Sequence, residues 1–382
     1  MRMITQQFAQ WCETASSRRR AEVISYLALS LIEGDLPKDQ RDKALAILTF
    51  ALDDPSPLVR MAMAEALSSS DRAPRHLVRS LADDIEEIAV LVASLSPVLT
   101  DADLIDIVVE GGAGPQAAVA GRPLLSGPVS AALAETAGGD ACSVLLANEG
   151  ARIGPDSHRR LAERHGMDGA VRALHLQRSD LPSDVRQTLL LHLGQALGAT
   201  PLVRNCLGEK RTQGVVLAAC ERSTALLADA VEPGEMAGLV DHLRQSGQLT
   251  TAFLIRIVCN GNIDLFAASL SALSGLPGRR VRAIVVDGRE AAFDALMARS
   301  GLSAAAGIFL RTAVQIWKQA VTQRAAFDLD AIAAEVMARL VQIFGDRRDE
   351  AGFAAVIALL GRLEREQMRG PARQPAENRA AA

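Results

Sequence analysis

The chain has 382 residues, of which 49% are hydrophobic and 3% aromatic, so it can bury a sizeable core and is not disordered as a whole. Its 41 basic and 45 acidic residues give a formal net charge of -4, which excludes a general attraction to nucleic acid or to an anionic membrane. The basic residues are almost all arginine, with lysine only at Lys38, Lys43, Lys210 and Lys318. In so arginine-rich a chain, an arginine cluster is weak evidence for phosphate binding.

The cysteines and the apolar runs indicate the compartment. The cysteines are odd in number, widely spaced and never in a Cys-x-x-Cys pair, which disfavours a disulfide scaffold or a closed zinc site. They are Cys12, Cys142, Cys206, Cys220 and Cys259. The longest apolar runs, residues 88–93 and 354–360, are far shorter than the ~20 residues that span a bilayer. We expect a cytoplasmic protein of bacterial type without a membrane span or a secretory signal.

The first clear elements are two helices joined by a short turn. Residues 40–52 place apolar side chains at the i, i+3, i+4 and i+7 spacing of one helix face. The sequence Asp53-Asp54-Pro55-Ser56-Pro57 ends this helix, because proline cannot continue the hydrogen-bond ladder. A second helix is predicted over residues 58–67. Helices joined by so short a turn pack antiparallel.

The same design recurs 29 residues later. The shift aligns Leu52 with Leu81, Asp54 with Asp83, and Val59 with Ile88. Self-similarity at a period of 20 to 50 residues is typical of a stack of helix pairs, in which each pair buries its apolar face against its neighbour.

Residues 52–60, followed by Ala62, Ala64 and Leu67, resemble the start of the second helix in a HEAT-like repeat, with Asp54, Pro55, Val59 and Arg60 in the usual order. The next copy has Ala89 in place of Arg60, which interrupts the Asp/Arg ladder of such repeats. Residues 40 to about 320 also resemble an uncharacterised alphaproteobacterial family known only as a domain of unknown function. This second resemblance rests on residues 120–126, 145–148, 178–182 and 256–261. It implies a helical fold and offers no activity.

Shorter helices follow, at residues 116–121, 126–137, 141–148, 155–165, 168–177 and 182–197. The motif Asp-Leu-Pro-x-Asp-x-Arg occurs at residues 35–41 and 180–186. Each copy is interpreted as a helix start with its first Asp as the cap, although a duplicated binding feature stays open.

Beyond a break near residues 199–208, a second helical module is predicted, with helices at 215–229, 235–246, 251–258, 265–274, 292–300 and 304–322. Residues 330–344 and 351–366 form two more helices, and 369–382 read as a disordered tail. The predicted domains are residues 1–200, 205–322, 323–368 and the tail. The fold class is all-α, a HEAT-like α-solenoid of antiparallel helix pairs followed by a second helical module.

Two segments resemble parts of nucleotide-binding folds. Residues 112–117 are glycine-rich and follow the β-branched run 105–109, but no strand–helix alternation surrounds them. The run 281–286 precedes Asp287 and lies near Arg279, Arg280 and Arg282, which could together hold an anion. The interpretation we favour is a helix with a glycine end in both places.

No catalytic, cofactor-binding or metal-binding residues are predicted. The six histidines lack the i, i+4 spacing with which two imidazoles share a zinc ion, and no Gly-x-Ser-x-Gly motif occurs. An enzyme is therefore disfavoured, though it stays an alternative, with its pocket between the modules.

The predicted function is a non-catalytic protein–protein interaction module in a scaffolding or regulatory role. A partner would lie on the concave face made by the second helices of the stack. The predicted contact residues there are Arg60, Met61, Glu65, Glu87 and Leu91. A DNA-binding helical-repeat protein is the other alternative, and it requires a continuous basic strip on that face.

Overall fold

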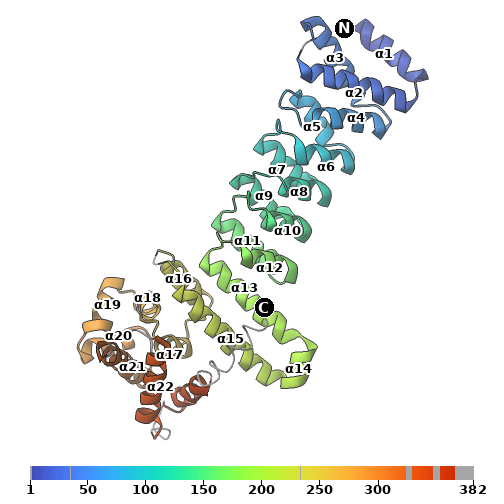
Figure 1. Ribbon diagram of the computed structural model, residues 1–382. Helices are drawn as coiled ribbons and strands as arrows, with labels where there is room; N and C mark the ends of the chain where they lie inside the picture. Colours follow the sequence, from blue (N-terminus) through green and yellow to red (C-terminus); the bar gives the residue numbers. More distant parts are fainter. Residues whose placement is uncertain (1, 35, 233, 324–328, 347–352, 366–382) are drawn as a thin grey trace. The chain divides into compact units, whose positions relative to one another are not determined.

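The computed structural model describes residues 2–34, 36–232, 234–323, 329–346 and 353–365 (Figure 1). Regular structure in these ranges is α-helical, apart from an isolated bridge between Leu125 and Ala151. The all-α prediction is confirmed. Backbone contacts divide the chain into two compact units, Met1–Val185 (unit 1) and Arg186–Ala382 (unit 2). The tail predicted at 369–382 lies outside the described residues.

Unit 1 is a two-layered stack of short helices (Figure 1). Its helices are α1 (Arg2–Thr14), α2 (Ser17–Glu33), α3 (Lys38–Ala51), α4 (Pro57–Leu67), α5 (Arg75–Ala82), α6 (Glu86–Leu95), α7 (Asp101–Glu110), α8 (Ala113–Ala120), α9 (Gly127–Thr136), α10 (Gly139–Ala147), α11 (Pro155–His165) and α12 (Gly169–Gln177). Each even-numbered helix packs on the next, from α2 to α12, while α7, α9 and α11 pack in order in the second layer. One apolar core runs between the layers, from Ala21 to Val171.

Local sequence signals explain where several of these helices begin. Thr100 and Asp103 form a reciprocal capping box that opens α7. Pro57 occupies the first turn of α4, where its missing N–H leaves no hydrogen bond unmade. The 29-residue period therefore places one helix pair after another with their apolar faces in register.

Ion pairs join successive repeats in the first part of the stack. Arg20 donates to both carboxylate oxygens of Asp54, at 2.8 and 2.9 Å. Arg60 does the same to Asp84, at 2.6 and 2.8 Å. Ala89, which replaces the next arginine, cannot continue this ladder, and it is buried.

Other arginines cap the C-termini of helices in the preceding repeat. Arg122 donates to the backbone carbonyls of Ala93 and Ser96 at the end of α6, at 2.7 and 2.8 Å. Arg164 bonds carbonyls at the end of α9, and Arg178 bonds carbonyls at the end of α10. Since the last four carbonyls of a helix have no partner within it, these arginines satisfy groups that would otherwise need water. Much of the arginine in unit 1 is thus structural.

Unit 2 is a second helical body. It contains most of α13 (Ser183–Ala199), α14 (Pro201–Leu207), α15 (Glu209–Asp229), α16 (Met236–Gln245), α17 (Thr251–Cys259), α18 (Ile263–Ser274), α19 (Gly278–Asp287), α20 (Glu290–Arg299), α21 (Ala304–Gln323), α22 (Leu329–Phe344) and a helical segment at 353–365. The core surrounds α17, which is buried from Phe253 to Cys259. Trp317 anchors α21 to it by donating to the carbonyl of Val258 at 2.7 Å.

The structure corrects several local predictions. The favoured helix interpretation of the β-branched runs is confirmed, since 105–109 and 281–286 lie within helices α7 and α19. The corrections concern helix starts. Gly112 opens α8 as its N-cap, so that helix begins at Ala113 rather than at residue 116. Asp180 does not cap α13, which begins at Ser183, because its carboxylate pairs with Arg178 instead. Asp35, the first Asp of the other motif copy, lies outside the described residues.

Candidate binding groove

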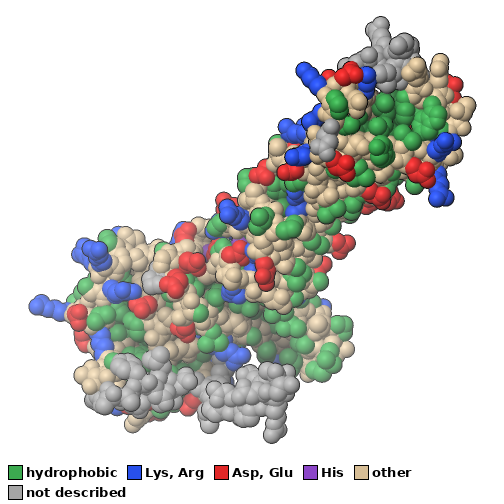
Figure 2. Space-filling model, turned by 45° about the horizontal axis from the view of Figure 1, so that its top comes forward, with side chains coloured by type: hydrophobic (Ala, Val, Ile, Leu, Met, Phe, Trp, Pro, Cys, Tyr) green, Lys and Arg blue, Asp and Glu red, His purple; other side chains and the backbone are tan. Residues whose placement is uncertain are grey.

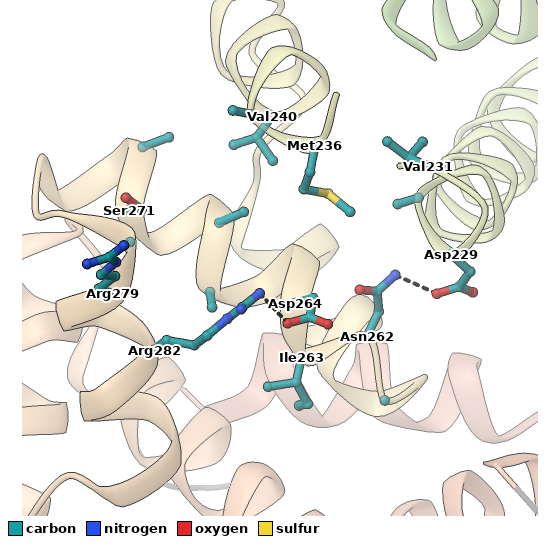
Figure 3. A pocket seen from close by; sticks show the side chains of 17 residues that line it. Asp229, Val231, Met236, Val240, Asn262, Ile263, Asp264, Ser271, Arg279 and Arg282 are labelled. Atoms are coloured by element: carbon teal, nitrogen blue, oxygen red, sulfur yellow. Dashed lines mark hydrogen bonds and ion pairs between the residues drawn. The ribbon is translucent and has the colours of Figure 1, made fainter. Parts of the chain in front are cut away.

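A groove of about 850 Å³ opens on the surface of unit 2 (Figure 3). Its floor is one face of α18, and its walls come from α16, the start of α19 and the end of α15. Figure 3 shows Met236 and Val240 pointing toward it from α16, with Arg279 and Arg282 on the opposite side. All lining residues belong to unit 2.

The floor of the groove consists of small side chains. Ala267, Ala268, Ser271 and Ala272 line it at the i, i+1, i+4 and i+5 spacing of a single helix face. The opposite face of α18 packs into the core of unit 2 through large apolar side chains, including Phe266. One helix therefore anchors in the core and presents a shallow surface to the outside, and this division follows from its 3.6-residue period.

The two ends of α18 are held by specific contacts. Asn262 caps its N-terminus, accepting from the backbone N–H of Leu265 at 3.0 Å. Gly275 ends the helix in the left-handed region, at φ 69°. Ser271 donates to the carbonyl of Leu276 at 2.7 Å, which ties the floor to the turn that leads into α19.

Opposite charges lie at the two ends of the groove. At one end, Asp229 accepts a hydrogen bond from Asn262 at 2.6 Å. Burial raises the pKa of Asp229, and the bond from Asn262 only partly opposes this. Arg279 lies at the other end and has no ion-pair partner among the described residues. Arg282 reaches from α19 to Asp264 in the first turn of α18 and pairs with it at 2.6 Å.

The predicted anion site is only partly assembled. Arg279 and Arg282 line the groove, whereas Arg280 and Asp287 are not among its lining residues. Asp287 is the last residue of α19, and Gly288 is its C-cap, as the helix interpretation predicted. Sequence reasoning missed Asp229, Asn262 and the floor of α18. The paired small residues of α18 were a visible signal, but their place on the floor of a groove was not.

The predicted partner surface of unit 1 lies on α4 and α6. Glu65 and Glu87 are exposed, and Met61 and Leu91 are half-buried against the core. The Arg60 guanidinium is held by Asp84 and by the carbonyl of Asp54 at 2.6 Å, and its side chain is 15% exposed. Arg60 therefore joins two repeats. The role of this surface stays a prediction.

Two buried histidines meet between α11 and α12. His158 Nδ1 lies 2.9 Å from His175 Nε2, with the rings stacked at 5.2 Å. Burial lowers the pKa of His158, and the carboxylate of Asp180, 3.6 Å from Nε2, opposes this shift. Across the described part of the chain, no group of three or more His, Cys, Asp or Glu side chains could hold a metal ion.

The remaining arginine clusters are largely neutralised. Arg159 pairs with Asp184 at 2.8 Å, and Arg160 pairs with Glu135 at 2.7 Å. Figure 2 shows basic and acidic side chains interspersed over the face that it presents. None of the helices in the described ranges is both long and apolar enough to cross a membrane.

Comparison with known proteins identifies the family and goes no further. No curated protein and no solved structure matches the chain. The model of one family, described as an uncharacterised protein conserved in bacteria (DUF2336), matches residues 88–343. This match covers the second half of unit 1 and most of unit 2, including the groove. The chain therefore belongs to the bacterial DUF2336 family.

Proposed function

We propose that the protein is a non-catalytic interaction module that binds an amphipathic helix of a protein partner in the groove on α18. The observation that carries this proposal is the small-residue face of α18 beside the apolar wall of α16. Small residues let a second helix approach closely, and the packing of side chains between helices requires such an approach. Met236 and Val240 supply apolar contacts along one wall. This is the helix-in-groove mode of peptide recognition.

The size of the groove suits a short helix. Its floor runs from Ile263 to Ala272, which is about 14 Å at 1.5 Å per residue. A partner helix of about ten residues would cover it. An apolar small molecule with a charged group is the competing occupant, because the volume also lies within the range of ligand pockets.

In our proposal unit 1 is a HEAT-like solenoid that acts as a scaffold, and the protein acts in the cytoplasm. The arginine–aspartate pairs between repeats support the first statement, and the five free cysteines support the second. Binding to DNA is disfavoured, because the arginines that would form a basic strip are engaged with acids and with carbonyls.

Panning a displayed library of helix-forming peptides of about twelve residues against the full chain tests the proposal. The counter-screen is Ala272→Trp, which fills the groove, and the matched control is Ala298→Trp, which changes an exposed alanine of α20 outside it. We expect selected peptides with apolar residues at i, i+4 and i+7, whose affinity falls about tenfold or more in Ala272→Trp only.

Three outcomes would contradict the proposal. The first is selection of no peptide, and the second is equal binding to both tryptophan variants. The third is a groove that takes up an apolar carboxylate but no helix. A shift of labelled duplex DNA in gels at two salt concentrations would favour the nucleic-acid alternative.

A further inference from the structure

The groove lies between two helix ends of opposite polarity. The C-terminus of α15 ends at Asp229, and the N-terminus of α19 begins at Gly278 beside Arg279. A helix carries a partial negative charge at its C-terminus and a partial positive charge at its N-terminus. Asp229 and Arg279 add full charges of the same sign at these two ends. The N-terminus of α18 lies at the Asp229 end and adds a partial charge of the opposite sign, so the side chains set the polarity. The groove is negative at Asp229 and positive at Arg279.

Both charges oppose the usual preference of their own helices. Acidic residues favour a helix N-terminus, yet the first turn of α19 has none and contains arginines. Asp229 is the last residue of α15, where a carboxylate is disfavoured. Asn262 donates to Asp229 Oδ1, and Oδ2 has no hydrogen-bond partner among the described residues. A bound group of opposite charge would therefore stabilise each of these two side chains.

The protein itself shows what an arginine in this setting binds. Arg122 and Arg164 each donate to the C-terminal carbonyls of a neighbouring helix. Arg299 does so at the end of α18, donating to the carbonyl of Ser274 at 2.8 Å. Arg279 lies at the same end of the groove floor, and in the described residues it makes no contact of this kind.

We infer that the groove fixes the direction of the bound helix, with its N-terminus at Asp229 and its C-terminal carbonyls at Arg279. The helix then lies parallel to α18, whose N-terminus is also at the Asp229 end. The free N–H groups of its first turn face the Asp229 carboxylate, and its free carbonyls face the guanidinium. The two contacts replace the caps that a short helix lacks in water. This inference rests on the proposed function.

The experiment uses a peptide from the selection, trimmed to its shortest binding segment. The peptide is made with a free or an acetylated N-terminus, and with a free or an amidated C-terminus. Affinities for the full-length wild type, Asp229→Asn and Arg279→Gln are measured by calorimetry. Arg280→Gln is the matched control, since Arg280 neighbours Arg279 but does not line the groove.

We expect the contribution of each terminal charge of the peptide to depend on one residue of the groove. The free carboxylate should bind about threefold better than the amide in wild type, and Arg279→Gln alone should abolish this advantage. The free amine should gain similarly over the acetyl form, and Asp229→Asn alone should abolish that gain. Arg280→Gln should leave both advantages unchanged.

Crossed couplings, in which Asp229→Asn improves binding of the carboxylate peptide, would show the opposite direction and overturn the inference. If a peptide loses its affinity for Ala272→Trp but shows neither dependence of a terminal charge on Asp229 or Arg279, the inference is overturned as well. The proposed function would then still hold. A selected peptide that binds Ala272→Trp as tightly as wild type would contradict the proposed function instead.

Discussion

The ion-pair ladder between repeats makes Arg60 the most informative residue to change in unit 1. Arg60 donates twice to Asp84, at 2.6 and 2.8 Å, and once to the carbonyl of Asp54. The two paired side chains are only 15% and 11% exposed. Arg60→Ala leaves the Asp84 carboxylate largely shielded from water without its cation.

The size of the effect follows from this geometry. Removing one partner of a buried ion pair typically costs about 3–5 kcal/mol. Asp84 keeps a hydrogen bond from the backbone N–H of Ile85 at 2.7 Å, so we expect a loss of about 2–3 kcal/mol. A double-mutant cycle with Asp84→Ala should assign about 2 kcal/mol to the pair itself.

Urea denaturation followed by circular dichroism measures the loss, and hydrogen exchange of peptides from α4 to α6 locates it. Arg18→Ala is the control, because Arg18 pairs with Glu22 where the side chains are 87% and 65% exposed. Such exposed pairs contribute little, and the control should behave as wild type. Equal stability of the two variants would refute the reasoning.

The pH dependence gives a second test of the same pair. Burial works to raise the pKa of Asp84, but hydrogen bonds from Arg60 and from the Ile85 N–H outweigh it and hold the pKa below its ordinary 3.8. The stabilisation is therefore complete above that pH and is lost as pH falls through the lower folded value. The difference between wild type and Arg60→Ala should stay constant from about pH 7 to pH 5 and shrink below about pH 4.

Three further changes can be checked by denaturation. Gly261→Ala should cost about 2–3 kcal/mol, because φ is 82° and the new Cβ would meet Trp317 at 2.6 Å; Gly301→Ala, with φ 77° and open space, should cost clearly less. Val59→Asp should cost more than about 4 kcal/mol by burying an unpaired charge, and an unchanged melting temperature would contradict this. Since burial lowers the pKa of His158, the unfolded chain takes up the proton first, and stability should fall as pH drops from about 6.5. His158→Phe should remove that slope between about pH 6.5 and 5, and an unaltered slope would argue against it.

Apolar periodicity along the chain was enough to predict the class of the fold and most of its helices. The apolar spacing of residues 40–52 and 58–67 predicted α3 and α4 to within a few residues, because a helix face is a local property of the chain. The run 281–286 illustrates the limit of local preference. Its β-branched residues suit a strand as well as a helix. In the folded protein they form a helix, because that places Val281 and Val285 in the core.

Which residues are available to a partner depends on how the helices pack against one another. Arg60 and Arg279 are alike in the sequence, but an acid from the next repeat engages one, and nothing in the described residues engages the other. Asp229 and Arg279 are distant in the chain and lie on one groove, because α18 packs against α16 and α19. Exposure depends on which helices pack together, and that depends on contacts between residues far apart in the chain, which periodicity does not specify.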